Sequence, residues 1–152
     1  MFSKEEAKEM RHAFWTKLDN KSGKMPGRNG KPIRWIGDKT GIKGLELKFD
    51  VDREQAVVAM EIRHTAIDNF EGLWSKMENC KPMFSKIFGG DKLIWQKEYQ
   101  KEAGDMVGRI YVSTPGDLFD KEKWSDMTRF MIDNMIQLET AFKEVQDYLK
   151  HF

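Results

Sequence analysis

The C-terminal segment of the chain carries the feature that most restricts its fold. Large apolar side chains recur there at steps of three and four residues: Trp124, Met127, Met131, Met135, Leu138, Phe142, Val145, Leu149 and Phe152. This spacing predicts one amphipathic helix, capped by Asp120, with an apolar stripe about 40 Å long at 1.5 Å per residue. One short helix cannot cover such a stripe. We therefore expect it to pack across the first helix and a sheet, and its end to meet a second copy of the chain.

The opposite end of the chain predicts a second, shorter amphipathic helix. Ser3 and Glu6 have the spacing of a capping box, in which a hydroxyl and a carboxylate each accept a hydrogen bond from the other residue's backbone amide. Apolar residues follow at helical spacing, so we expect a helix from about Lys4 to Leu18. Residues 20–32, rich in Gly, Pro and Lys, predict an exposed loop. Its basic side chains, which could contact phosphates or simply be solvated, are Lys21, Lys24, Arg28 and Lys31.

Strand patterns occur in neighbouring pairs between these helices. A short extended segment is expected at residues 34–36. Apolar and polar residues then alternate strictly over residues 45–51, which predicts a strand with one buried and one solvated face. A polar turn and an apolar run at residues 56–64 complete an antiparallel hairpin. A second pair of strands is predicted at residues 93–99 and 106–112, joined by a polar turn.

The element order predicts the fold class. Residues 66–88 have helical spacing, but Pro82 lacks an amide hydrogen, so we expect a break just before it and an end at Gly89 and Gly90. Strands that come in pairs, rather than singly between helices, favour an α+β fold. We expect an antiparallel or mixed sheet of about four to five strands, packed against the N-terminal helix, the broken middle helix and the long C-terminal helix. No linker divides the chain, which predicts a single domain over residues 1–152.

The composition argues against several classes of function. A net charge of +1 gives no overall positive field to attract nucleic acid or anionic lipid. The single Cys80 excludes an internal disulfide and a cysteine-based zinc site. The opening residues form no apolar signal segment, and no apolar run approaches the roughly 20 residues that span a bilayer. We therefore expect a cytoplasmic protein with no membrane partner. Walker, GxGxxG and GxSxG motifs are absent, and we expect no cofactor.

The first hairpin carries fragments of a catalytic pattern. Asp50 or Asp52 followed by Glu61 on the next strand is similar to the core of the PD-(D/E)xK nucleases, in which carboxylates on neighbouring strands hold a divalent metal. The lysine of that pattern is replaced here by Arg63, which stays protonated and cannot act as a base. The alternative is a ladder of ion pairs on the solvated face, joining Glu61 or Arg63 to Lys48 or Asp50.

Aromatic and basic side chains on the predicted strands suggest a binding surface. Strict alternation places Trp95 on one strand face with Lys97 and Tyr99, and Arg109 on another with Tyr111. Flat rings beside cations can stack bases or pair with phosphate, although the same residues suit a core with a polar fringe. The candidate binding residues are Trp35, Arg63, His64, Trp95 and Arg109.

Segments spread over nearly the whole chain carry a family resemblance. They are Ser3–Ala7 with Phe14–Thr16, Trp35–Ile36 with Lys39–Lys43, Glu61–His64, Trp95 with Lys97 and Tyr99, Arg109–Tyr111, and Lys121–Trp124. In this order they resemble the family called domain of unknown function 4268. The resemblance implies an uncharacterised bacterial protein. Related domains occur at the C-terminus of longer, nuclease-like bacterial proteins, which implies a nucleic-acid or defence context and assigns no functional residue.

Two functions follow as hypotheses. The first is a non-catalytic binding module, for protein or nucleic acid, that self-associates through the C-terminal helix. The absence of a complete catalytic set in the sequence favours it. The second is a divergent metal-dependent nuclease that uses Asp50 or Asp52 with Glu61 and requires Mg²⁺ or Mn²⁺.

Overall fold

A computed structural model describes residues 2–24, 40–66, 69–102 and 104–151. Its elements in chain order are α1 (Lys4–Lys24), β1 (Leu45–Val51), β2 (Gln55–Arg63), a short 3₁₀ helix (His64–Ala66), α2 (Phe70–Asn79), α3 (Lys81–Phe88), β3 (Ile94–Gln100), β4 (Met106–Pro115), a second 3₁₀ helix (Lys121–Lys123) and α4 (Trp124–Lys150). The predicted α+β class is confirmed. The predicted segment at residues 34–36 lies outside the described residues.

The strands form one antiparallel sheet in the order β1-β2-β4-β3. Both predicted hairpins are present, because β1 pairs with β2 and β3 pairs with β4. The pairing of β2 with β4 joins the two hairpins, so these two strands occupy the centre of the sheet. Central position explains why every residue from Ala56 to Ile62 is buried, whichever way its side chain points.

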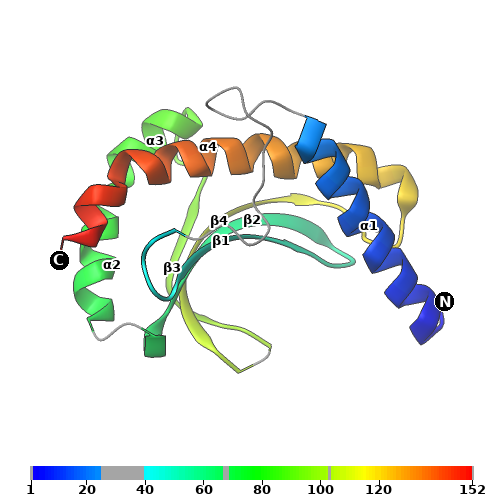
Figure 1. Cartoon of the computed structure of the whole chain (residues 1–152), viewed down its shortest axis with the longest axis horizontal. Helices are drawn as coiled ribbons and strands as arrows, with labels where there is room; N and C mark the ends of the chain where they lie inside the picture. The colour runs from blue at the N-terminus through cyan, green and yellow to red at the C-terminus, as the bar shows by residue number, and fades with distance from the viewer. Residues whose placement is uncertain (1, 25–39, 67–68, 103, 152) are drawn as a thin grey trace.

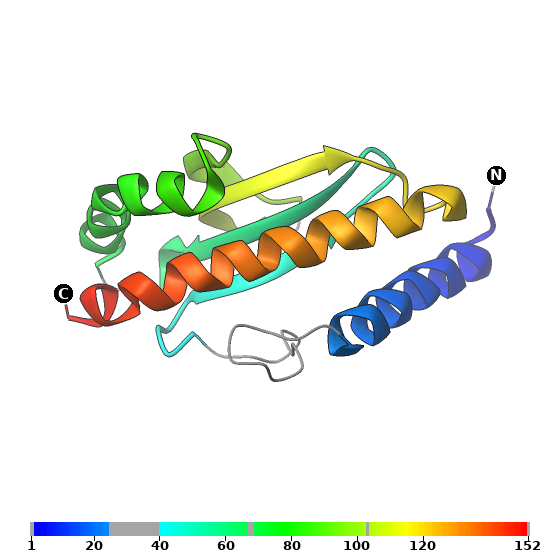
Figure 2. The same ribbon diagram turned by 90° about the horizontal axis from the view of Figure 1, so that it is seen from above.

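The sheet is arched, and α4 lies across its convex face (Figure 1). Seen from above, α1 runs beside the first half of α4 and α3 lies beside its second half (Figure 2). The apolar stripe of α4 is buried from Trp124 to Leu149 by the sheet and the other helices. Along the described part of α4 the stripe is therefore covered within the chain. Self-association through α4 stays a prediction. The uncovered apolar stripe from which we predicted it is not present along this part of the helix.

The start of α1 confirms the capping box. The Glu6 amide donates to Ser3 Oγ at 3.1 Å, and the Ser3 amide donates to Glu6 Oε1 at 3.2 Å. The helix is longer than the sequence predicts, since it runs to Lys24. Lys21, expected in a basic loop, instead donates from α1 to the carbonyl of Ser125 and to Thr128 Oγ1. This contact with α4 stabilises an end of α1 that lacks apolar periodicity.

The middle helix is broken where the sequence predicts. α2 ends at Asn79 and α3 begins at Lys81, with Pro82 in the first turn of α3, where its missing amide hydrogen costs nothing. Asn69 caps α2 by accepting a hydrogen bond from the Gly72 amide at 3.0 Å.

Packing of α2 on the sheet requires a glycine in β4. A Cβ atom at Gly108 would lie 2.7 Å from the ring of Trp74 and 2.9 Å from the ring of Phe70. Both rings are buried and cannot swing away freely. We expect Gly108→Ala to lower the free energy of unfolding by about 1–3 kcal/mol through overpacking. Urea denaturation measures this loss. Ser113→Ala, on the opposite face of β4, is the matched control and should change the midpoint little; equal losses would contradict the explanation.

Candidate functional site

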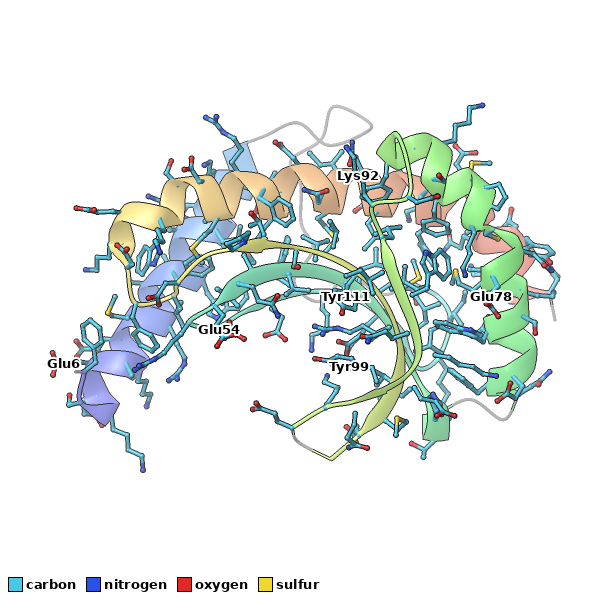
Figure 3. All side chains as sticks on the ribbon, turned by 180° about the vertical axis from the view of Figure 1, so that it is seen from behind. Glu6, Glu54, Glu78, Lys92, Tyr99 and Tyr111 are labelled. Atoms are coloured by element: carbon cyan, nitrogen blue, oxygen red, sulfur yellow. The ribbon has the colours of Figure 1, made fainter. Side chains whose placement is uncertain are left out.

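The concave face of the sheet, opposite α4, holds a cluster of charged side chains. β1, β2 and β4 each contribute every second residue to this face. Its centre is a cavity of about 420 Å³, here called the charged hollow, whose ionisable lining includes Lys48, Asp50, Asp52, Glu61, Lys101 and Arg109. Tyr99 and Tyr111 also point into the space under the arch (Figure 3). None of the described helices covers this space.

Glu61 is the centre of the ion-pair network in the charged hollow. Lys101 Nζ donates to Glu61 Oε1 at 2.9 Å, and Lys48 Nζ lies 3.9 Å from the same oxygen. Arg109 Nε lies 3.2 Å from Glu61 Oε2. The Lys48 contact confirms one ion pair of the predicted ladder. The expected solvated position is wrong, however, because the Glu61 side chain is only 1% exposed.

Arg109 contacts two tyrosine rings. Its guanidinium carbon lies 4.3 Å from the centroid of Tyr99 and 4.7 Å from that of Tyr111. Arg109 pairs with Glu61 across the β2–β4 ladder, so the backbone register sets the two charges opposite each other. Its Nη2 is 3.5 Å from Asp50 Oδ2. The two rings also contact each other, with centroids 6.3 Å apart and planes inclined by 61°, and together they restrict the orientation of the guanidinium.

Glu61 and Arg109 form an ion pair that is not a hydrogen bond. Glu61 Oε2 and Arg109 Nε are close enough for Coulombic attraction, yet neither atom has a hydrogen-bond partner in the described residues. Buried charged groups are normally hydrogen-bonded, and an unmade bond costs about 1–3 kcal/mol. An exception of this kind at the floor of an open cavity calls for an explanation.

A β-bulge in β3 brings Tyr99 to this face. Gln96 pairs with Arg109 and Tyr99 pairs with Val107, so two residues of β3 face the single Gly108 of β4. The extra residue reverses the alternation beyond it. Trp95 therefore faces the helices, whereas Tyr99 faces the charged hollow. The prediction that Trp95 and Tyr99 share a strand face is wrong for this reason.

His64 stabilises the bulge. Its Nε2 lies 2.8 Å from the carbonyl oxygen of Lys97, one of the two bulge residues. Its ring stacks on Phe70 with centroids 3.7 Å apart. Because a carbonyl can only accept, Nε2 carries the proton and donates. His64 thus acts on the concave face indirectly, by fixing the bulge that sets the direction of Tyr99.

Lys101 is held in its charged form. Burial alone would lower its pKa, but the hydrogen bond to Glu61 and the charges of Glu61 and Glu46 raise the pKa above its usual value. The stabilisation from this contact is therefore complete below the pKa of the unfolded chain and is lost as the pH rises through the higher folded value. A lysine with a raised pKa is a poor general base near neutral pH.

The three carboxylates of the nuclease hypothesis line the charged hollow, but they are not arranged to share a metal ion. Glu61 pairs with Glu46, four residues before Asp50 on β1, so the backbones of Asp50 and Glu61 are about 14 Å apart at 3.4 Å per residue. The cationic guanidinium of Arg109 contacts both carboxylates. Asp52 Oδ1 accepts hydrogen bonds from the backbone amides of Glu54 and Gln55 in the turn. Across the described ranges, no three His, Cys, Asp or Glu side chains are arranged to hold a metal ion.

The predicted binding residues do not gather in one patch. Arg109 lies in the charged hollow, while the Trp95 ring packs edge-on against Phe84 and Trp74 and carries Lys81 Nζ 5.0 Å above it. Arg63 borders a separate cavity formed with residues 40–46. His64 contacts the bulge, and Trp35 lies outside the described residues.

Sequence reasoning missed Lys101 and treated Lys48 only as a partner in a surface ladder. Lys101 follows Tyr99 by two residues, so the bulge that redirects Tyr99 also brings Lys101 to the concave face. Its sequence signal is present, since an aromatic residue and a cation alternate there, but the face is predictable only when the extra residue in β3 is known.

Comparison with known proteins places the chain in a family. No helix in the described segments is long and apolar enough to cross a membrane. No curated protein and no solved structure matches the chain significantly. One family, described as Domain of unknown function (DUF4268), matches residues 10–146 of the 152-residue chain. Because this match covers most of the sequence, the chain belongs to the DUF4268 family.

Proposed function

We propose that this protein is a non-catalytic binding module whose ligand face is the concave face of the sheet. One observation carries the proposal. Glu61 and Arg109 are buried at the floor of a cavity that the described elements leave open, and their ion pair lacks a hydrogen bond. Buried charge is costly, and apolar residues of similar volume often stabilise a fold as well or better. Charges retained at such a place are best explained by a ligand.

The chemistry of the charged hollow supports binding over catalysis. Arg109 is permanently protonated, and the pKa of Lys101 is raised, so neither cation is a base near neutral pH. Tyrosine and arginine, which meet here as Tyr99, Tyr111 and Arg109, are the residue types enriched at the energetic centres of macromolecular interfaces.

A photo-crosslinking residue incorporated at a single site tests the ligand face. Glu46 and Gln96 are exposed positions of the sheet, paired with Glu61 and Arg109, whereas Gln137 is exposed on α4. In cells, the probe at position 46 or 96 should give a discrete adduct, and the probe at position 137 should not. Tyr99→Ala should reduce the adduct, because it removes one of the two aromatic rings that contact Arg109. The same adduct from all three positions, or none from 46 and 96, would refute the proposal.

An assay with purified protein distinguishes binding from nuclease activity. We expect the protein to leave plasmid DNA or RNA intact when it is incubated with either in the presence of Mg²⁺ or Mn²⁺. Metal-dependent cleavage that disappears in Glu61→Ala would establish the nuclease hypothesis in place of the binding module. A urea denaturation curve for Glu61→Ala is the necessary control, because loss of fold would also abolish activity.

A further inference from the structure

We propose that Lys48 and Lys101, at the mouth of the charged hollow, bind a carboxylate of a partner polypeptide. The inference rests on the proposed function and adds the chemistry of the ligand. The first support is an imbalance of charge at the inner wall of the hollow. Lys48, Lys101 and Arg109 all contact Glu61, which is a single carboxylate. The second carboxylate near these cations, Asp50, contacts Arg109 and is 55% exposed. Three cations therefore share one buried anion.

The second support is the order in which a ligand would meet these groups. The side chains of Lys48 and Lys101 are 29% and 26% exposed, whereas those of Glu61 and Arg109 are 1% and 3% exposed. An entering group thus reaches the two ammonium groups first. Lys48 Nζ lies 3.9 Å from Glu61 Oε1, which is too far for a hydrogen bond. It can therefore donate to a ligand without breaking a hydrogen bond to Glu61. Two donors close to one oxygen suit a small anion with two acceptor oxygens.

The rim of the hollow favours an isolated carboxylate over a chain of phosphates. Asp50, Asp52 and Glu102 line the outer part of the cavity. A nucleic-acid backbone brings several negative charges, and these carboxylates would repel its flanking phosphates. One face of each tyrosine ring is also occupied by Arg109, which reduces the surface available for stacking bases. Charges of both signs around tyrosines suit a polypeptide, which can carry charges of both signs, whereas a nucleic-acid backbone carries only negative ones.

A titration followed by nuclear magnetic resonance tests this inference with the full chain labelled with ¹⁵N. The probe is N-acetyl-glutamate N-methylamide, and the matched control ligand is its glutamine analogue. The glutamate probe should cause saturable shifts in amides of β1, β2 and the 101–102 segment, and the glutamine analogue should not. Lys101→Gln and Lys48→Gln should each weaken binding about tenfold, as expected for loss of one charge-assisted contact. Lys92→Gln, on an exposed loop, should leave the affinity unchanged, and urea midpoints confirm that each variant is folded.

Other outcomes overturn the inference in distinguishable ways. Equal shifts with the glutamine analogue, or an equal loss of affinity in Lys92→Gln, would show that Lys48 and Lys101 do not select a carboxylate. Binding of single-stranded oligodeoxythymidine at the concave face, without a response to the glutamate probe, would assign the face to nucleic acid. In both cases, position-specific crosslinks from Glu46 and Gln96 would keep the proposed function intact. If the glutamate shifts and the crosslinks are both absent, both proposals fail.

Discussion

Glu61→Gln should lower the free energy of unfolding by about 3–5 kcal/mol, as is typical when one partner of a buried ion pair is removed. The substitution preserves shape, but it leaves the Arg109 guanidinium, 3% exposed, without its nearest carboxylate. Lys48, Lys101 and Arg109 then lie close together without the buried carboxylate that they share. The exposed carboxylate of Asp50, 3.5 Å from Arg109 Nη2, offsets only part of this repulsion. Chemical denaturation at neutral pH measures the loss.

The reciprocal substitution gives the internal control. Arg109→Met removes the cation, yet Glu61 keeps its hydrogen bond to Lys101 at 2.9 Å. We therefore expect a smaller loss, about 1–3 kcal/mol, from one unsatisfied contact and altered packing beside the two tyrosines. The double variant should lose less than the sum of the two, since each single change removes the same pair. A larger loss in Arg109→Met than in Glu61→Gln would contradict the view that Glu61 is the shared anion.

Local patterns in the sequence predict the elements that depend on short-range chemistry. Strict alternation over residues 45–51 predicts the same bounds of β1, Leu45–Val51, that the structure has. The proline rule gives the break between α2 and α3, and the capping box gives the start of α1. Each of these features is decided by neighbours within a few residues, so the sequence carries the necessary information.

The site depends on two features that local patterns do not determine. One is the order of strands, because only the pairing of β2 with β4 sets Arg109 opposite Glu61 and buries both charges. The other is the bulge in β3, where Lys97 and Glu98 lie opposite a single residue of β4. Neither of them is a glycine, so the sequence gives no local signal of the bulge. Alternation predicted Glu61 on the face of Lys48 and Asp50 correctly, but it could not predict the burial of Glu61.

The second large effect is expected at Phe14, which attaches α1 to the rest of the fold. Its side chain is fully buried, and its ring meets Trp124 edge-on at 5.4 Å. Within the described part of α1, only two further residues are buried, Leu18 and Ser22. Phe14→Ala should therefore remove about 3–5 kcal/mol of stabilisation, the usual cost of truncating a buried phenylalanine. Few contacts are left to hold α1, and most of a helix's stability in a protein comes from packing of its apolar face.

The loss should appear as local detachment of α1. In amide hydrogen exchange, α1 should lose protection while β2 and β4 keep theirs, because α1 packs mainly against α4, whereas the strands pack against one another and against α4. Glu9→Ala, an exposed position of α1, should leave the exchange pattern unchanged. Parallel loss of protection in β2 and β4 would show instead that α1 and the sheet unfold together. Since α1 contributes no residue to the charged hollow, Phe14→Ala should also bind the glutamate probe with unchanged affinity, which separates the stability of α1 from the function of the concave face.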